Sequence, residues 1–359
     1  MNNANPFYKA FELIGQTVVI AVGERIEYMN SSAEQVFGKN RVGEMLSGIF
    51  PTYLLNVQAS SFASTMLVGT QSFGVSVMAI PEDNTRVFVM TPRASFDTDN
   101  ALVLSHLRNE LMNIRMATAQ LFALGQSSSD PTLLESSGML NRSYHSIKRL
   151  VDNLSVIRLL GLGELPFAPR NFDLTEACRD ILDSLGYMMG ERSPTLRFSA
   201  AEHYRIVGDR MLIELLLMNL LVNSIEHCTP DNTVSVSLLR TNKSIILGVS
   251  DNGSGIEQGG LAGIFDSFRR STELPGAEQG CGMGLSIVQG IAELHGGAVI
   301  IESRGKGLGT SVRVTLSDNA NARVRFSDGY LRTDDLKNRL LTQCSSILPD
   351  GCFSEEPDK

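Results

Sequence analysis

Two asparagines, four residues apart in a largely apolar run, have side chains suited to metal chemistry. Asn219 and Asn223 lie in the stretch NLLVNSIEH, which ends at His227. A helix over 210–227 would place both side chains on one face, because residues four apart lie one above the other. Amide oxygens suit a hard cation such as Mg²⁺, which prefers oxygen ligands and keeps waters and phosphate oxygens around it. Taken alone, the pair indicates either a Mg²⁺ site or two satisfied polar groups.

A carboxylate follows the predicted strand 244–251, at the start of the stretch DNGSGI. Asp251 at such a strand end can accept a hydrogen bond from an exocyclic amine. Gly253 and Gly255 lack side chains, so the backbone there can approach a flat base closely. The same letters also occur in ordinary turns, and the stretch gains meaning only from its neighbours.

Three alternating glycines in the stretch GCGMGLSIV lead into a predicted helix. Gly280, Gly282 and Gly284 would present backbone N–H groups and a helix N-terminus to a phosphate. The stretch IFDSFRR, residues 264–270, precedes them and ends in a basic pair that includes Arg270. Alone, the glycines fit a flexible loop as well as a phosphate cradle.

In this order, the four stretches resemble the ATP-binding domain shared by sensor histidine kinases, gyrase-type ATPases and Hsp90-type chaperones. The resemblance covers about 173–316, and the closing stretch ELHGGAVIIESRGKGLGTSVRVTL is similar to the histidine kinase version. It implies ATP and Mg²⁺ as cofactors. By this resemblance Asn223 holds Mg²⁺ and Asn219 is a catalytic candidate. The remaining ATP-binding residues that it implies are Asp251 at the adenine amine, Gly253, Gly255, the lid glycines Gly280, Gly282 and Gly284, and Thr310 near the base.

One position departs from the histidine kinase pattern. These kinases carry Lys or Arg three residues after the Mg²⁺ asparagine, where this sequence has Glu226. A carboxylate there repels a triphosphate unless it points away. We therefore expect weaker ATP binding, or a substitute cation such as Arg270.

Two long helices are predicted before this domain. Leu104, Leu107, Leu111, Ile114, Thr118 and Leu121 form one apolar seam, and Leu140, Tyr144, Ile147, Leu150 or Val151, Leu154 and Ile157 form the second. A break at Gly125–Pro131 makes the pair an αα-hairpin. One hairpin cannot bury both seams, whereas two copies can do so as a four-helix bundle. The pattern therefore predicts a homodimer.

Histidine kinases keep their phosphoacceptor in such a hairpin, within a segment that reads HELRTPLTAI. The segment here is SHLRNELMNI, so Ser105 takes the histidine position and His106 the acidic one beside it. With the apolar seam of this helix facing inward, the helical period places the side chains of Ser105 and His106 mostly on the outer face. His106 is the candidate acceptor, with Glu110 one turn later as its acidic neighbour. The alternatives are that His106 is an exposed polar residue, or that Ser105 is the acceptor. His145 is expected on the surface.

The first 95 residues are predicted to be a small α/β module. Strands are expected at 17–22, 26–29, 72–79 and 86–91, with a short helix from Ala33 to Gly38. The stretch IEYMNSSAEQVFG resembles the early strand and helix of a PAS sensor domain. An ordinary α/β module fits equally well.

The composition of the chain limits the partners and the cellular location that we expect. The chain of 359 residues has a formal charge of −8, which argues against electrostatic binding to nucleic acid. It also lacks an apolar run long enough to span a membrane. No signal peptide is evident, and five scattered cysteines fit free thiols in a reducing cytosol without a zinc site. We therefore expect a cytoplasmic protein.

These observations predict an α+β multidomain chain. Its parts are a PAS-like sensor domain (1–95), a dimerisation and phosphotransfer hairpin (96–165), an α/β sandwich ATP-binding domain (170–318) and a C-terminal tail (319–359). The resemblance implies the function of a sensor histidine kinase in a two-component system, with a response regulator as partner. Whether the chain is an active enzyme is left open, because its histidine is displaced by one position. The alternative is a degenerate pseudokinase that binds ATP and signals by conformation or by binding a partner. A gyrase- or Hsp90-type ATPase is disfavoured, because the hairpin precedes the ATP site.

Overall fold

The computed structural model places most of the chain in two compact units. It describes residues 8, 11–12, 16–39, 41–57, 59, 61–69, 71–80, 83–92, 101–128, 131–190, 193–241, 244–257, 283–317 and 335–354. The first unit comprises Met1–Ala94, Ser254–Gly282 and Ala298–Val314, and the second comprises Ser95–Gly253, Met283–Gly297 and Thr315–Lys359. The predicted domain boundaries stay predictions.

An antiparallel sheet organises the first unit. Its strands are β1 (Thr17–Val22), β2 (Arg25–Met29), β3 (Ser61–Val68), β4 (Gln71–Ile80), β5 (Thr85–Pro92) and β11 (Val299–Ser303), in the order β2-β1-β5-β4-β3-β11. Asn30 caps the helix α2 (Ser31–Phe37) by accepting the N–H of Ala33 at 3.0 Å. The strands and helix expected from the sequence are present, whereas β3 was not predicted. Whether this module is a PAS domain stays a prediction.

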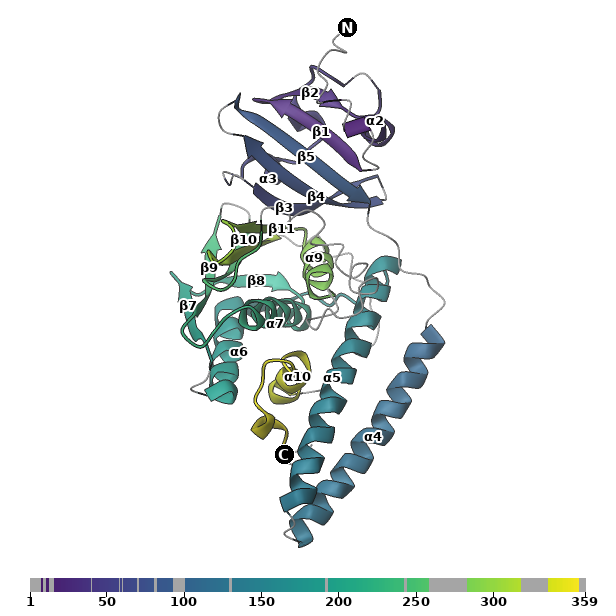
Figure 1. Cartoon of the computed structure of the whole chain (residues 1–359), viewed down its shortest axis with the longest axis vertical. Helices are drawn as coiled ribbons and strands as arrows, with labels where there is room; N and C mark the ends of the chain where they lie inside the picture. The colour runs from purple at the N-terminus through teal and green to yellow at the C-terminus, as the bar shows by residue number, and fades with distance from the viewer. Residues whose placement is uncertain are drawn as a thin grey trace. The chain divides into compact units, whose positions relative to one another are not determined.

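Two long helices pack together in the second unit, as expected for a hairpin. They are α4 (Ala101–Ser128) and α5 (Pro131–Leu162). Among the described elements, α4 packs mainly against α5 (Figure 1). Their shared core contains Leu104, Leu111, Tyr144 and Val151. Not every predicted seam residue is buried there, because a single hairpin buries only one stripe of each helix.

The remainder of the second unit is an α/β layer. The strand β9 (Thr233–Arg240) pairs antiparallel with β10 (Ser244–Asp251) and parallel with β7 (Thr195–Ala200), and β6 (Arg170–Asp173) pairs with β8 (Arg205–Gly208). The helices of this layer are α6 (Leu174–Met189), α7 (Arg210–Glu226) and α9 (Gly284–Leu294). α7 is buried on nearly all sides, which explains why its sequence is apolar almost throughout.

A C-terminal helix completes the second unit. The sequence predicts a helix at 334–342, and the structure has α10 (Leu336–Gln343), followed by a 3₁₀ turn, η6 (Asp350–Phe353). Figure 1 shows α10 in yellow between α5 and the pair α6 and α7. In the part of the chain that the structure describes, no helix has the length and apolar character needed to cross a membrane.

Candidate functional site

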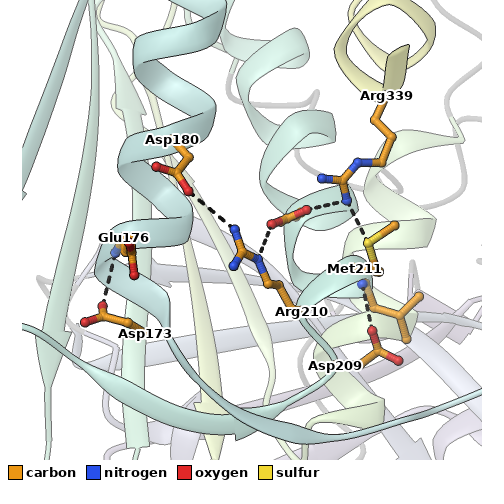
Figure 2. A network of polar contacts seen from close by, with 9 residues as sticks. Asp173, Glu176, Asp180, Asp209, Arg210, Met211 and Arg339 are labelled. Carbon is orange, nitrogen blue, oxygen red and sulfur yellow. Dashed lines mark hydrogen bonds and ion pairs between the residues drawn. The ribbon is translucent and has the colours of Figure 1, made fainter. Parts of the chain in front are cut away.

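The site begins at the helix α7, whose first turn is fixed by Asp209. The Oδ1 atom of Asp209 accepts the N–H of Leu212 at 3.2 Å (Figure 2). Its Oδ2 atom accepts the N–H of Ala168 at 2.9 Å. Its own N–H donates to Nε2 of the buried His295 at 3.0 Å. The Nδ1 atom of that ring lies 2.8 Å from the carbonyl oxygen of Ile291. His295 therefore joins the end of α9 to the start of α7.

The two asparagines of α7 meet the first residue of α9. A Cβ atom built on Gly284 would lie 3.1 Å from Oδ1 of Asn219 and 3.5 Å from the amide atoms of Asn223. Asn219 is buried, and its Nδ2 atom donates to the carbonyl oxygen of Leu215 at 2.9 Å. Among the residues that the structure describes, its Oδ1 atom has no hydrogen-bond partner. An unpartnered amide oxygen facing a glycine at a helix N-terminus suits a polar ligand.

Asp251 lies at the end of β10, close to the end of α7. Its Oδ1 atom accepts the N–H of Gly253 at 3.0 Å, which fixes the carboxylate. Burial raises the pKa of the Cys228 thiol to about 11, and the charge of Asp251 adds to this. A side chain at Gly253 would overlap the carbonyl oxygen of His227, so only glycine fits there without a shift. His227 itself is exposed.

Two further predicted residues belong to the first unit. Gly255 has a positive φ of 63°, and a side chain there would overlap the carbonyl oxygen of Gly305. Thr310 begins β12 (Thr310–Ser317) opposite Ser303 of β11. The Oγ atom of Ser303 accepts the N–H of Ile256 at 2.9 Å, which ties the glycine loop to this strand pair.

Three predicted residues lie outside the described residues: Arg270, Gly280 and Gly282. Glu226, the departure from the kinase pattern, is half-buried. Burial raises the pKa of Cys344 to about 12, and the charges of Arg149 and Glu226 act on it in opposite directions. Glu226 therefore lies near the end of α10. Cys178, Cys228 and Cys344 are free thiols.

The hairpin histidines differ from each other. His106 and Ser105 are both exposed on α4, as helical phase indicates. His145 was expected on the surface, and this was wrong, because its side chain is only 6% exposed. Its Nδ1 atom lies 3.0 Å from Oγ1 of Thr342 on α10. The local sequence could not predict this burial, because His145 is covered by residues of the C-terminal segment, which is distant along the chain.

Sequence reasoning missed a charged cluster within α7. Glu214 is 2% exposed and lies between Arg210, at 2.7 Å, and Arg339 of α10, at 2.5 Å. Figure 2 shows Arg210 reaching also to Asp180 of α6, at 3.4 Å. A single glutamate in an apolar run, four residues after an arginine, was the available signal. Among the described residues, no group of three His, Cys, Asp or Glu side chains is arranged to hold a metal ion.

Comparison with known proteins identifies the fold that carries these residues. Residues 208–320 match the family described as histidine kinase-, DNA gyrase B-, and HSP90-like ATPase. The chain is 32% identical over 206 residues to a Bacteriophytochrome of Pseudomonas aeruginosa, covering 56% of this chain and 27% of that protein. It is 25% identical over 169 residues to the sensor histidine kinase YvrG of Bacillus subtilis, covering 47% and 29%. The solved catalytic domain of the histidine kinase ThkA aligns with a TM-score of 0.37 at 23% identity, covering 42% of this chain and 96% of that domain.

The family match and the sequence relatives define the class of this domain. The chain carries an ATPase domain of the histidine kinase type and is related to sensor histidine kinases. It spans less than a third of the length of the two curated relatives above.

Proposed function

We propose that this chain binds Mg-ATP and acts as a cytoplasmic sensor histidine kinase-like signalling protein. The observation that carries the proposal is the meeting of Asn219 and Asn223 with Gly284 at the start of α9. There an amide oxygen of Asn219 is buried without a partner among the residues that the structure describes. Asn223, half-buried beside it, would hold Mg²⁺, which neutralises phosphate charge when bound. Asp251 would accept the adenine amine, and Thr310 would lie near the base.

The phosphoryl acceptor in this proposal is His106. An imidazole nitrogen would attack the γ-phosphorus, a P–N bond would form, and the bond to the leaving ADP oxygen would break. The exposed Glu110, one turn after His106, would take the imidazole proton. A response regulator aspartate would then receive the phosphoryl group.

Homodimerisation accounts for the part of the hairpin seams that one chain leaves uncovered. Leu107, Ile114, Leu140, Ile147 and Leu150 were all expected in the seam and are 38–42% exposed. A second hairpin would cover such a stripe in a four-helix bundle. Leu111, by contrast, is 5% exposed inside one hairpin, so charge at Leu111 tests the hairpin and charge at Ile147 tests the dimer.

The alternative is an ATP-binding pseudokinase. It is favoured by the register of α4, where the kinase pattern places Ser105 and not His106 at the acceptor position. Misplacing reacting atoms by about 1 Å can lower a rate on the order of 100-fold. We therefore expect the wild-type chain to phosphorylate itself weakly.

Incubation with γ-labelled ATP separates the two functions. The proposal expects weak, acid-labile and base-stable label that His106→Ala removes. The double variant Ser105→His with His106→Glu restores the family register and should label more strongly. If neither protein labels while both bind ATP, the pseudokinase alternative stands. Acid-stable label would identify Ser105, and a chain that does not bind ATP would refute the proposed function.

A further inference from the structure

The C-terminal residues 335–354, called the strap below, form an ordered segment with its own buried side chains. Asp335 caps α10 by accepting the N–H of Asn338 at 2.8 Å. Seven side chains of the strap are at most 6% exposed: Leu340, Leu341, Thr342, Cys344, Ser345, Leu348 and Phe353. Such burial is not the behaviour of a frayed terminus.

One side of the strap is anchored on the ATPase domain. Arg339 forms an ion pair with the buried Glu214 of α7 at 2.5 Å, and its Nη1 atom lies 2.7 Å from the sulfur of Met211 (Figure 2). The Sγ atom of Cys352 lies 3.2 Å from the carbonyl oxygen of Met188 on α6. Separating Arg339 from Glu214 would leave a buried carboxylate short of a partner, which makes this attachment hard to break.

The other side of the strap contacts α5 through polar groups and through the ring of Phe353, which lies 5.7 Å from the ring of His145. Asn141 donates from Nδ2 to the carbonyl oxygen of Phe353 at 3.0 Å, and Arg149 donates to Oγ of Ser346 at 2.8 Å. His145 contacts Thr342 at 3.0 Å, and Arg142 forms an ion pair with Asp350. Hydrogen bonds of this kind each contribute only about 0.5–1.5 kcal/mol net, because water replaces the partner after separation. The strap is therefore held on α5 by several separate contacts of this strength and on α7 by one buried ion pair.

These contacts lie far along α5 from the point where this helix meets α9, so they can restrict rotation about that point. α5 also touches α9, where a Cβ atom on Gly290 would lie 2.5 Å from Leu160, near the end of α5. The strap contacts α5 at 138–149, which lies about 17–33 Å away along the helix at 1.5 Å per residue. A contact near the end of α5 alone permits the helix and the ATPase domain to swing about it. A second attachment this far away prevents the swing.

We propose that the strap is a built-in clamp that holds α5 against α6 and α7 and restrains the ATPase domain. Its release from α5 frees the domain to move relative to the hairpin that carries His106. The mechanical part of this inference stands independently of catalysis. The regulatory part, in which the clamp inhibits phosphotransfer, rests on the proposed function.

Gly138 offers a matched test of the clamp. A Cβ atom built on this glycine of α5 would lie 3.0 Å from Oγ and 3.8 Å from Cβ of Ser354. Gly138→Gln should therefore wedge the strap away from α5. Gly161→Gln, in the same helix, is the control, because a Cβ atom at this position meets no atom of the described residues within 4 Å. The 3.8 Å spacing also suits a disulfide, so Gly138→Cys with Ser354→Cys, in a Cys352→Ser background, should lock the strap in place.

X-ray scattering and labelling with γ-labelled ATP provide independent readouts on these full-length proteins. The wedge should enlarge the radius of gyration and raise the labelling rate at least threefold. The oxidised lock should show neither change and should match the wild type in both readouts. If no variant labels but the wedge still enlarges the molecule, the clamp stands and the kinase function fails. If the wedge unfolds by circular dichroism, a chain ending at Pro349, without η6, replaces it. A disulfide that does not form, or identical scattering from the released and locked proteins, would overturn the clamp.

Discussion

Removing the charge of Glu214 should strongly destabilise the second unit. The Glu214 side chain is 2% exposed, whereas the side chains of its partners Arg339 and Arg210 are 18% and 47% exposed. Glu214→Gln keeps the shape of the side chain but removes the one counter-charge of the largely buried Arg339 among the described residues. Loss of one partner from a buried pair costs about 3–5 kcal/mol. Because Arg210 is half in solvent and adds little, we expect about 3 kcal/mol.

Urea unfolding followed by far-UV circular dichroism measures this change, since the chain has no tryptophan for fluorescence. With a slope of about 2 kcal/mol/M, a loss of about 3 kcal/mol lowers the midpoint by about 1.5 M. Glu257→Gln is the control. Its carboxylate pairs with Lys306 at 3.6 Å, but both side chains are more than 70% exposed, so the midpoint should not move.

A double variant distinguishes lost charge pairing from lost packing. Glu214→Leu with Arg339→Leu replaces the ion pair by two apolar side chains. Such replacements are often neutral or stabilising, so the double variant should recover most of the loss. A Glu214→Gln midpoint within about 0.3 M of the wild type would refute the reasoning.

Three further outcomes are expected. Asp251→Asn should weaken ATP binding at least tenfold in calorimetry, because a charged acceptor for the adenine amine is lost, and the exposed Asp231→Asn should bind ATP like the wild type. Ile147→Glu should give a folded monomer by light scattering, and a persisting dimer would contradict the bundle. Burial lowers the pKa of His295 from 6.5, so the unfolded chain binds this proton first and stability should fall as the pH drops below about 6.5. His295→Gln should flatten that slope in urea unfolding measured at several pH values, and an unchanged slope would contradict the assignment.

Local patterns in the sequence predict much of the ATPase domain. The strand 244–251 and the helix that starts at Arg210 agree with the structure, because the strand buries every second residue at Ile245, Leu247 and Val249, and Asp209 caps the apolar helix. The spacing of Asn219 and Asn223 predicts a shared face, and the structure places both beside Gly284.

Features that depend on distant partners could not be predicted. His145 and Glu214 are buried by residues of α10, and no local pattern announces a partner so far along the chain. Only part of the predicted apolar seam of α4 is buried in the structure: Leu111 lies inside the hairpin, whereas Leu107 is exposed. Helical period alone cannot assign one apolar stripe to two different neighbours.

Calorimetric titration with ATP, in Mg²⁺ and in chelator, tests the central claim most directly. The wild-type chain should bind ATP, and Mg²⁺ should strengthen binding. Asn223→Ala should remove the strengthening and leave the circular dichroism spectrum unchanged. If the wild type does not bind ATP, or if Mg²⁺ strengthens binding to Asn223→Ala as much as to the wild type, the assignment of this site is contradicted.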